Sequence, residues 1–131
     1  MLDNIAALHA QCFPHRPWAA SEFADLKKSG CDIIASQNGF VVWRVVGTDA
    51  EIITLGVAPA ARRTGIAAAM LAIIEAESRK AGATRMILDV AEDNAAARAL
   101  YTGAGYKIDG RRPKYYDGTD AILMSKTLTS D

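Results

Sequence analysis

Residues 62–67, Arg-Arg-Thr-Gly-Ile-Ala, constrain the fold more than any other stretch of this sequence. They follow an apolar run over residues 52–57 that is typical of a strand, and they precede a helical pattern over 66–79. A strand that turns tightly into a helix directs unpaired backbone N–H groups and the positive end of the helix dipole at one point. Gly65 lets an anion approach the backbone, and two arginines add positive charge. The stretch therefore predicts a phosphate-binding turn, although it is neither a Walker A loop nor a three-glycine dinucleotide motif.

The length and composition indicate one folded domain over residues 1–131. Half of the residues are apolar, which is enough for a hydrophobic core. Fifteen basic and fifteen acidic side chains cancel, so we expect no general attraction to nucleic acid or to anionic membranes. An acidic residue stands where a secretory signal needs positive charge, and the longest apolar run, over 65–74, is too short for a membrane span. We expect a cytoplasmic monomer or homodimer.

Isolated cysteines and histidines give no sign of a metal site. Cys12 and Cys31 lack neighbours at metal-ligand spacing, so we expect both to be reduced thiols. His9 and His15 likewise have no apparent partners, and neither is expected to have a catalytic or metal-binding role. No metal is therefore expected.

Hydrophobic periodicity predicts alternating helices and strands. Asn38-Gly39 favours a tight hairpin turn, and a strand–helix–strand crossover should make the strands before and after residues 66–79 parallel. Helices are expected over 3–12, 18–26, 66–79 and 95–102, and strands over 31–36, 40–46, 51–57, 85–90, 106–112 and 121–128.

Four motifs in order resemble those of the GNAT N-acetyltransferase superfamily, and among its members the ribosomal-protein N-terminal acetyltransferases of the RimI type. They are Arg-x-x-Gly-x-Ala at 62–67, Met-Ile-Leu-Asp-Val at 86–90, the run over 93–101, and Gly-Tyr at 105–106. The resemblance implies an α/β (α+β) fold with a central mixed sheet flanked by helices. Members usually open with a strand, whereas this sequence starts inside the first helix, so we expect that strand to be absent.

The resemblance also implies the reaction, which is direct transfer of an acetyl group from acetyl-CoA to a primary amine. Neither cysteine is expected near the thioester sulfur, so we expect no covalent enzyme intermediate. Gly56 suits a bulge or a close approach on the strand that pairs with pantetheine, or else marks a loosely packed strand. The residues implied to bind the cofactor are Leu55, Val57, Arg62, Arg63, Thr64, Gly65, Ile66, Ala67, Asn94 and Tyr101.

The resemblance implies catalytic roles for three residues, each of which also has a structural interpretation. Tyr101 stands where the family's tyrosine protonates the departing thiolate, but it could instead anchor its helix to the sheet. Asp89 stands where RimI-type sequences have a catalytic glutamate, and its shorter side chain could need a water to reach the amine. Glu51 is the reserve candidate for the base, and either carboxylate could be an exposed charge at a strand end. Asn94 could contact pantetheine, cap its helix, or do both.

The acceptor is expected to be the α-amino group of a protein N-terminus. Residues 111–116, Arg-Arg-Pro-Lys-Tyr-Tyr, resemble the segment that closes over the acceptor peptide in N-terminal acetyltransferases. Tyr115 and Tyr116 are the candidate substrate-binding residues, although an ordinary loop would look the same. The alternatives are a small-molecule amine acetyltransferase and an acyl-CoA-binding module that has lost turnover.

Overall fold

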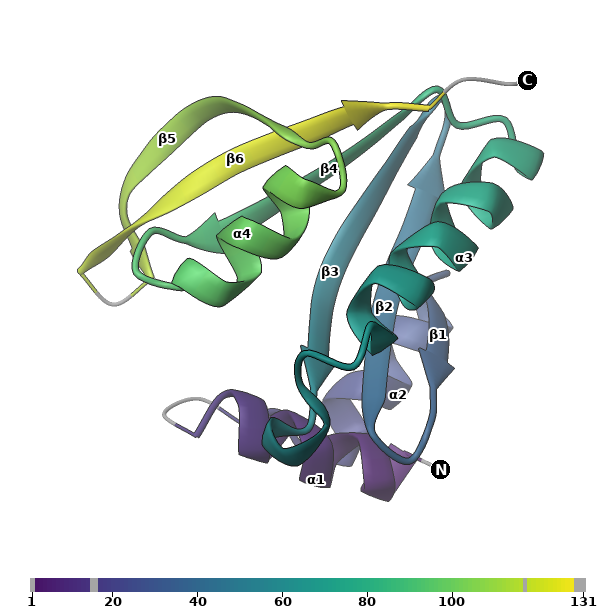
Figure 1. Cartoon of the computed structure of the whole chain (residues 1–131). Coiled ribbons are helices and arrows are strands. Elements are labelled where there is room, and N and C mark those ends of the chain that lie inside the picture. Colours follow the sequence, from purple (N-terminus) through teal and green to yellow (C-terminus); the bar gives the residue numbers. More distant parts are fainter. Residues whose placement is uncertain (1, 15–16, 117, 129–131) are drawn as a thin grey trace. The chain divides into compact units, whose positions relative to one another are not determined.

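A computed structural model of the chain describes residues 2–14, 17–116 and 118–128 (Figure 1). Its strands form one mixed sheet in the order β1-β2-β3-β4-β6-β5, and helices flank the sheet. The elements are α1 (Leu2–Cys12), α2 (Ala20–Lys28), β1 (Asp32–Ala35), β2 (Gly39–Val46), β3 (Asp49–Val57), the 3-10 turn η1 (Pro59–Ala61), α3 (Ile66–Lys80), β4 (Arg85–Ala91), α4 (Ala95–Gly103), β5 (Lys107–Tyr116) and β6 (Thr119–Thr127). All four expected helices and all six expected strands are therefore present.

The chain divides into two compact units. The first unit consists of residues 1–44 and 53–74, and the second of residues 45–52 and 75–131. Strands β2 and β3 and helix α3 each contribute residues to both units. Each unit has its own candidate site residues, so the two units are described separately.

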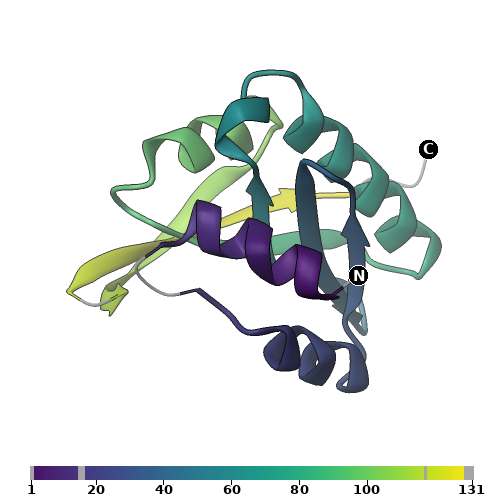
Figure 2. The same ribbon diagram turned by 90° about the horizontal axis from the view of Figure 1, so that it is seen from below.

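The core of the first unit lies between α1, α2 and the β1–β2 hairpin. Helices α1 and α2 lie side by side (Figure 2), and β1 pairs with β2 in antiparallel register from Asp32–Trp43 to Ala35–Phe40. Apolar residues at helical spacing on α1 and α2 point into this core, because only that face can be removed from water. The buried residues of the cluster are Ile5, Leu8, Phe23, Cys31, Phe40, Val42 and Ala58.

The turn between β1 and β2 differs from the Asn-Gly turn that we expected. The N–H of Ser36 donates to the carbonyl of Gly39 at 2.8 Å, so the two loop residues are Gln37 and Asn38. Gly39 is the first residue of β2 and is not among the glycines with positive φ. A Cβ on Gly39 would lie 3.2 Å from side-chain atoms of Ile66 and Met70. A side chain at position 39 would therefore crowd α3, and a local turn pattern does not reveal this close approach.

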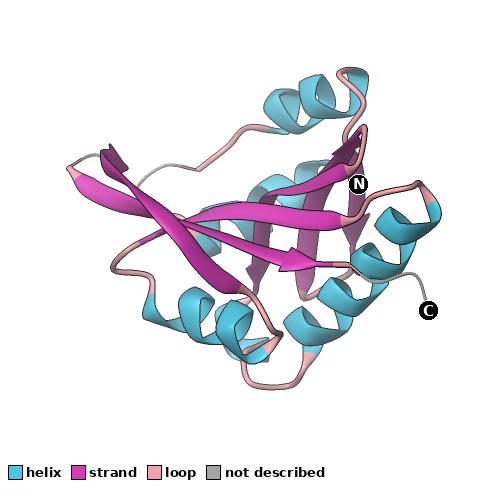
Figure 3. Ribbon diagram, turned by 90° about the horizontal axis from the view of Figure 1, so that it is seen from above, coloured by secondary structure: helices cyan, strands magenta, loops and turns pink. Residues whose placement is uncertain are grey.

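The second unit is built on β4, β6 and β5, which lie next to one another in the sheet; Figure 3 distinguishes strands, in magenta, from helices, in cyan. β4 and β5 both run antiparallel to β6, and the first residues of β3 pair with β4 in parallel, as the crossover predicts. The parallel ladder joins residues 49–51 to residues 85–87. Met86, Leu88 and Val90 alternate as buried residues along β4, which leaves Asp89 on the opposite, less buried face.

The last two strands are longer than expected, because β5 continues through Pro113 to Tyr116. Proline normally ends a strand, since it has no N–H to donate. Here the register shifts between Arg112, which pairs with Ala121, and Tyr116, which pairs with Thr119. Between these pairs, three residues of β5 (113–115) lie opposite one residue of β6, Asp120, and this bulge accommodates the proline.

A buried polar group joins α3 to β6 within the second unit. The hydroxyl of Tyr106 donates to Glu75 Oε2 at 2.9 Å, and Lys126 Nζ lies 2.9 Å from Glu75 Oε1. Burial and the neighbouring carboxylate raise the pKa of the Tyr106 phenol, which therefore stays protonated as the donor. A buried carboxylate that has two partners is satisfied rather than reactive.

The residues that the structure describes include no helix with the length and apolarity of a membrane span.

Candidate active site

The turn at residues 62–67 lies in the first unit and has the geometry that its sequence predicts. Arg63 and Gly65 have φ values of 66° and 85°, so the chain twice adopts the left-handed conformation before α3 begins at Ile66. The N–H of Ala69 donates to the carbonyl of Gly65 at 3.0 Å and closes the first turn of α3. The amides that precede Ala69 are the ones a helix leaves without an intrahelical partner.

The surface above this turn is open to an anion. Residues Arg62 to Gly65 are exposed, and a Cβ built on Gly65 would meet no protein atom within 4 Å. Thr64 Oγ1 donates to the carbonyl of Ala61 at 2.5 Å, and this hydrogen bond stabilises the turn. Unpaired amides, the helix dipole and open space are what a pyrophosphate needs at a helix N-terminus. The turn therefore fits the phosphate part of coenzyme A.

The carboxyl end of β3 is held in place by side chains that the sequence analysis did not connect with it. Arg62 Nε donates to the carbonyl of Val57 at 3.1 Å, and Cys12 Sγ donates to the same oxygen at 3.3 Å. The N–H of Ala58, in the same peptide group, donates to the carbonyl of Asn38 at 2.7 Å. The peptide group after Val57 is thus fixed from three directions.

Cys12 makes a contact with the end of β3 that no sequence pattern indicates. Both cysteines are unpaired thiols, as expected, but Cys12 contacts Val57 from a distance of 45 residues along the chain. No spacing rule connects two such residues. The thiol donates its hydrogen to the carbonyl of Val57, so its role here is to hold the strand.

Gly56 permits a close approach and is not a sign of loose packing. A Cβ at this position would lie 2.8 Å from the ring of Phe40 and 2.9 Å from Cys12 Sγ. Leu55 is half-buried and Val57 is buried on either side of it. The first unit thus brings together the predicted cofactor residues of β3 and of the turn, which are Leu55, Val57 and residues 62–67.

The second unit places both candidate bases on one face of the sheet. Glu51 pairs with Ile87 on β4, and Asp89 lies two residues further along the same strand. Side chains two residues apart on a strand share a face, so Glu51 and Asp89 face the same way. Burial and the negative charge of Glu51 raise the pKa of the Asp89 carboxyl, whereas the positive charge of Arg112 opposes this rise; burial is the largest cause. A raised pKa brings a carboxylate closer to the basicity that proton abstraction requires.

Tyr101 and Asn94 hold helix α4. Tyr101 is 6% exposed, its ring centroid lies 5.7 Å from that of Tyr106, and its carbonyl accepts the N–H of Tyr106 at 2.9 Å. Asn94 Oδ1 accepts the N–H of Ala97 at 3.1 Å, which confirms the capping role. The anchoring interpretation of Tyr101 is thus supported by contacts, and its catalytic role remains a prediction.

The β5 bulge presents Tyr115 at the surface with 50% of its area exposed, and the guanidinium carbon of Arg112 lies 4.8 Å from the centre of its ring. Arg111 has a different environment, since it forms ion pairs with Glu92 at 2.7 Å and with Asp120 at 2.9 Å. Tyr116 ends β5, and its side chain lies outside the described residues. The neighbouring residues Arg111 and Arg112 therefore have different contacts: Arg111 pairs with two carboxylates, and Arg112 lies over an aromatic ring.

His9 has partners, contrary to expectation. It is 3% exposed, its Nδ1 accepts the N–H of Trp18 at 3.1 Å, and its ring stacks on that of Trp18 at 4.8 Å. Burial lowers the pKa of His9 to about 4, so the ring is neutral at physiological pH. His15 lies outside the described residues. In the described part of the chain, no group of three His, Cys, Asp or Glu side chains is placed to bind a metal.

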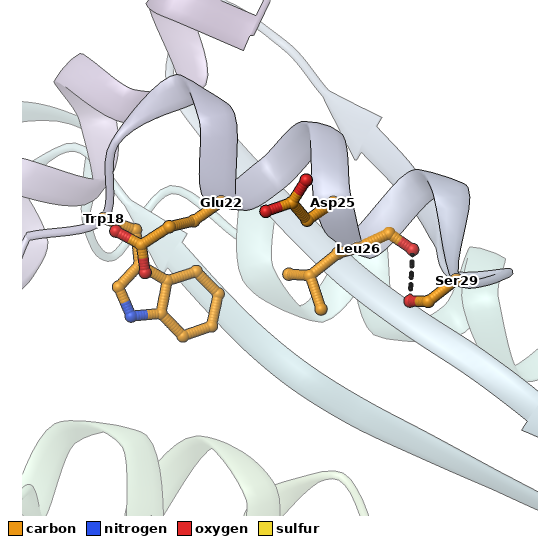
Figure 4. Close-up of a pocket in the computed structure, with 5 residues that line it drawn as sticks. All are labelled: Trp18, Glu22, Asp25, Leu26 and Ser29. Carbon is orange, nitrogen blue, oxygen red and sulfur yellow. Dashed lines mark hydrogen bonds between the residues drawn. The ribbon is translucent and has the colours of Figure 1, made fainter.

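A shallow depression lies along α2 and its two ends. Figure 4 shows that it is lined by Trp18, Leu26 and Ser29 together with two acidic residues. Ser29 Oγ donates to the carbonyl of Leu26 at 2.9 Å, which closes the last turn of α2. None of the predicted site residues contributes to this depression.

Comparison with known proteins identifies the family of this chain. The sequence pattern described as Acetyltransferase (GNAT) family matches residues 2–106. The chain belongs to the GNAT acetyltransferases. It is 32% identical, over 97% of its own length and 93% of the relative's, to the [Ribosomal protein bS18]-alanine N-acetyltransferase of Escherichia coli strain K12.

Two solved structures have the same fold. The crystal structure of the ribosomal-protein-S18-alanine N-acetyltransferase from Escherichia coli matches with a TM-score of 0.86 and 27% identity, and the match covers 98% of this chain and 88% of that one. A NatC complex bound to Gag peptide and CoA matches with a TM-score of 0.82 and 22% identity, covering 98% of this chain and 91% of that one. This GNAT chain is thus an N-acetyltransferase.

Proposed function

We propose that this GNAT protein transfers the acetyl group of acetyl-CoA to the α-amino group of a protein N-terminus. The binding of acetyl-CoA is supported by the open turn at residues 62–67, whose unpaired amides and exposed surface suit a diphosphate. The acceptor half is supported by the 32% identity to an enzyme named for acetylating the alanine of a ribosomal protein. The acceptor of this chain is proposed to be of the same class, a ribosomal protein among the candidates.

The donor would be held by main-chain groups of the first unit. Amides of residues Arg63 to Ala67 would bind the diphosphate, and Arg62 would keep the turn attached to Val57. Main-chain groups of Leu55 and Val57 would pair with pantetheine, which is consistent with the parallel ladder ending at Glu51 before these residues. Asn94 would contact pantetheine from the helix that it caps.

The reaction would proceed by direct attack of the amine on the thioester carbonyl. The N–H of Val57 would stabilise the developing oxyanion, since a fixed donor costs no reorganisation during the reaction. Asp89 would accept the proton of the acceptor amine, and Tyr101 would donate its phenolic proton to the departing thiolate. The new bond is C–N, the bond that breaks is C–S, and each proton moves to a named group.

The remaining residues of the site have secondary roles in the proposal. Glu51 is the reserve base, because it shares the sheet face of Asp89. Tyr115 and Tyr116 would line the approach of the acceptor peptide, which the exposure of Tyr115 permits. We further propose that the two units act as a single cytoplasmic domain over residues 1–131, as a monomer or homodimer, without metal, nucleic acid or membrane partners. The family match, which includes residues of both units, supports a single domain.

Acetylation assays with peptides and small amines test the proposal. Purified protein and acetyl-CoA are incubated with peptides that have a free small-residue N-terminus, with the same peptides blocked at the N-terminus, and with a polyamine and an aminoglycoside. We expect acetylation of the free peptides alone, and we expect Tyr101→Phe to lower kcat about a hundredfold. Acetylation of the small amines alone would identify a small-molecule enzyme. Background turnover in both the wild type and Tyr101→Phe would identify an acyl-CoA-binding module.

A further inference from the structure

The register of the second unit places a third charged residue on the face that holds both candidate bases. Asp89 and Ala91 lie on one face of β4, and Ala91 pairs with Ala121 of β6. Ala121 pairs in turn with Arg112 of β5. Paired residues in a sheet project to the same side, so Arg112 lies on the face of Asp89. Arg112 Nη1 lies 4.0 Å from Asp89 Oδ2.

Arg112 makes two weak contacts, one with Asp89 and one with the ring of Tyr115. The ion pair with Asp89 is at the long end of the range, and the two side chains are 53% and 24% exposed. The same guanidinium lies 4.8 Å from the centre of the Tyr115 ring, a distance that suits a cation–π contact. Arg112 can therefore leave the carboxylate without losing its other partner.

The bulge that holds Arg112 and Tyr115 together is itself fixed. Lys114 has a φ of 54°, and its N–H donates to Asp120 Oδ1 at 2.9 Å. The other oxygen of Asp120 accepts from Arg111 at 2.9 Å. The positions of Arg112 and Tyr115 are thus set by hydrogen bonds outside the reacting face.

We propose that Arg112 is a positioning residue of the acceptor site: its guanidinium is the resident counter-ion of Asp89, and the ammonium group of the acceptor displaces it while the Tyr115 ring retains it. This inference rests on the proposed function and adds the residue whose positive charge competes with the acceptor ammonium for Asp89. An α-amine reaches the site mostly as an ammonium ion, since its usual pKa is about 8. A carboxylate that already has a cation close by stays ionised and ready for that exchange.

Substitution of a residue that binds the acceptor directly would weaken acceptor binding, whereas substitution of Arg112 should strengthen it. Removal of Arg112 removes a cation that competes with the acceptor, so the acceptor should bind more tightly. The same removal should raise the pKa of Asp89, because the charged groups that act on this carboxyl among the described residues are Arg112, which lowers its pKa, and Glu51, which raises it. Its other strand neighbours, Ile87, Ala91 and Leu123, are apolar.

Three variants test the proposal, with two readouts each. The acceptor KM is measured at pH 7, where the peptide amine is mostly an ammonium ion, and the Asp89 carboxyl is titrated by 13C NMR, with Asp89→Asn giving the assignment. For Arg112→Gln we expect an acceptor KM about two- to fivefold lower and an Asp89 pKa higher by about half a unit, as for a half-exposed ion pair. Arg112→Lys keeps the charge and should stay near the wild type.

Arg85→Gln is the matched control, because Arg85 also forms an exposed ion pair on β4, with Asp49 at 3.2 Å. It should change neither readout. In the Asp89→Asn background, Arg112→Gln should have no further effect on the acceptor KM. A raised acceptor KM in Arg112→Gln, or an Asp89 titration that does not move, would overturn the inference even if peptides are acetylated. A wild type that acetylates no peptide would overturn the proposed function, and the NMR titration would still show whether Arg112 governs Asp89.

Discussion

Arg62 Nε donates a hydrogen bond to the carbonyl of Val57 at 3.1 Å, and this bond ties the phosphate-binding turn to the end of β3. In the proposed reaction the turn holds the diphosphate and the strand holds the thioester. A single side chain thus sets the spacing between the two parts of the donor site. Its guanidinium thus connects the turn to the strand and also places a positive charge beside the turn.

Arg62→Ala should therefore weaken acetyl-CoA binding more than a distant surface charge would. Loss of the bond leaves the turn free to move relative to Val57, at a cost of about 0.5–1.5 kcal/mol. We expect the KM for acetyl-CoA to rise about two- to tenfold while the acceptor KM stays unchanged. Arg79→Ala, in the last turn of α3, is the control. Equal effects of the two substitutions would show that only net charge matters.

Gly56→Ala should destabilise the first unit. The added Cβ would lie 2.8 Å from the Phe40 ring and 2.9 Å from Cys12 Sγ, so the strand or its neighbours must shift. Overpacking of this kind costs about 1–3 kcal/mol of unfolding free energy. Gly103→Ala serves as the control, because a Cβ there meets nothing within 4 Å and alanine favours helix. Urea unfolding of both variants gives the comparison, and equal midpoints would show that Gly56 is not closely packed.

His9 predicts a loss of stability in mild acid. Its pKa is about 4 in the folded protein and near 6.5 when unfolded, so the unfolded state binds the proton first. The stabilisation is complete above pH 6.5 and is lost as the pH falls towards 4, with an upper bound of about 3 kcal/mol. His9→Asn keeps an acceptor for the Trp18 N–H but cannot gain this charge. Urea unfolding at pH 7 and pH 5 should show a smaller difference for the variant. An equal difference in both proteins would assign the acid sensitivity to other groups.

Much of the fold could be predicted because its signals are local. Asn94 caps α4, and Gly82 with a φ of 97° follows the end of α3, so patterns of a few residues located these helices. The tight turn at residues 62–67 that leads into α3 was located for the same reason. Asn38-Gly39 shows the limit of such patterns, since Gly39 lies outside the two-residue loop and closely approaches Ile66 and Met70 of a helix far along the chain.

The parts that could not be predicted depend on contacts between distant residues. Cys12 and Val57 are 45 residues apart, and no periodicity links them. The alternation of β5 is interrupted between Ile108 and Gly110 and again between Arg112 and Tyr116, so the sequence alone does not show which face of the sheet Arg112 takes. The second interruption is held by Asp120 of the next strand, which accepts the N–H of Lys114. The buried environment of His9 likewise depends on rings from α2 and β2.

The measurement that tests the central claim most directly is calorimetric titration of acetyl-CoA into Gly65→Val and Gly82→Val. Both glycines have a left-handed φ, 85° and 97°, and a Cβ at either meets no protein atom within 4 Å, so both variants should lose a similar amount of stability, about 1–2 kcal/mol. The account predicts that Gly65→Val binds acetyl-CoA at least about tenfold more weakly, because its side chain fills the space of the diphosphate, and that Gly82→Val binds it as the wild type does. Unchanged affinity in Gly65→Val would contradict the assignment of this turn as the site that holds acetyl-CoA.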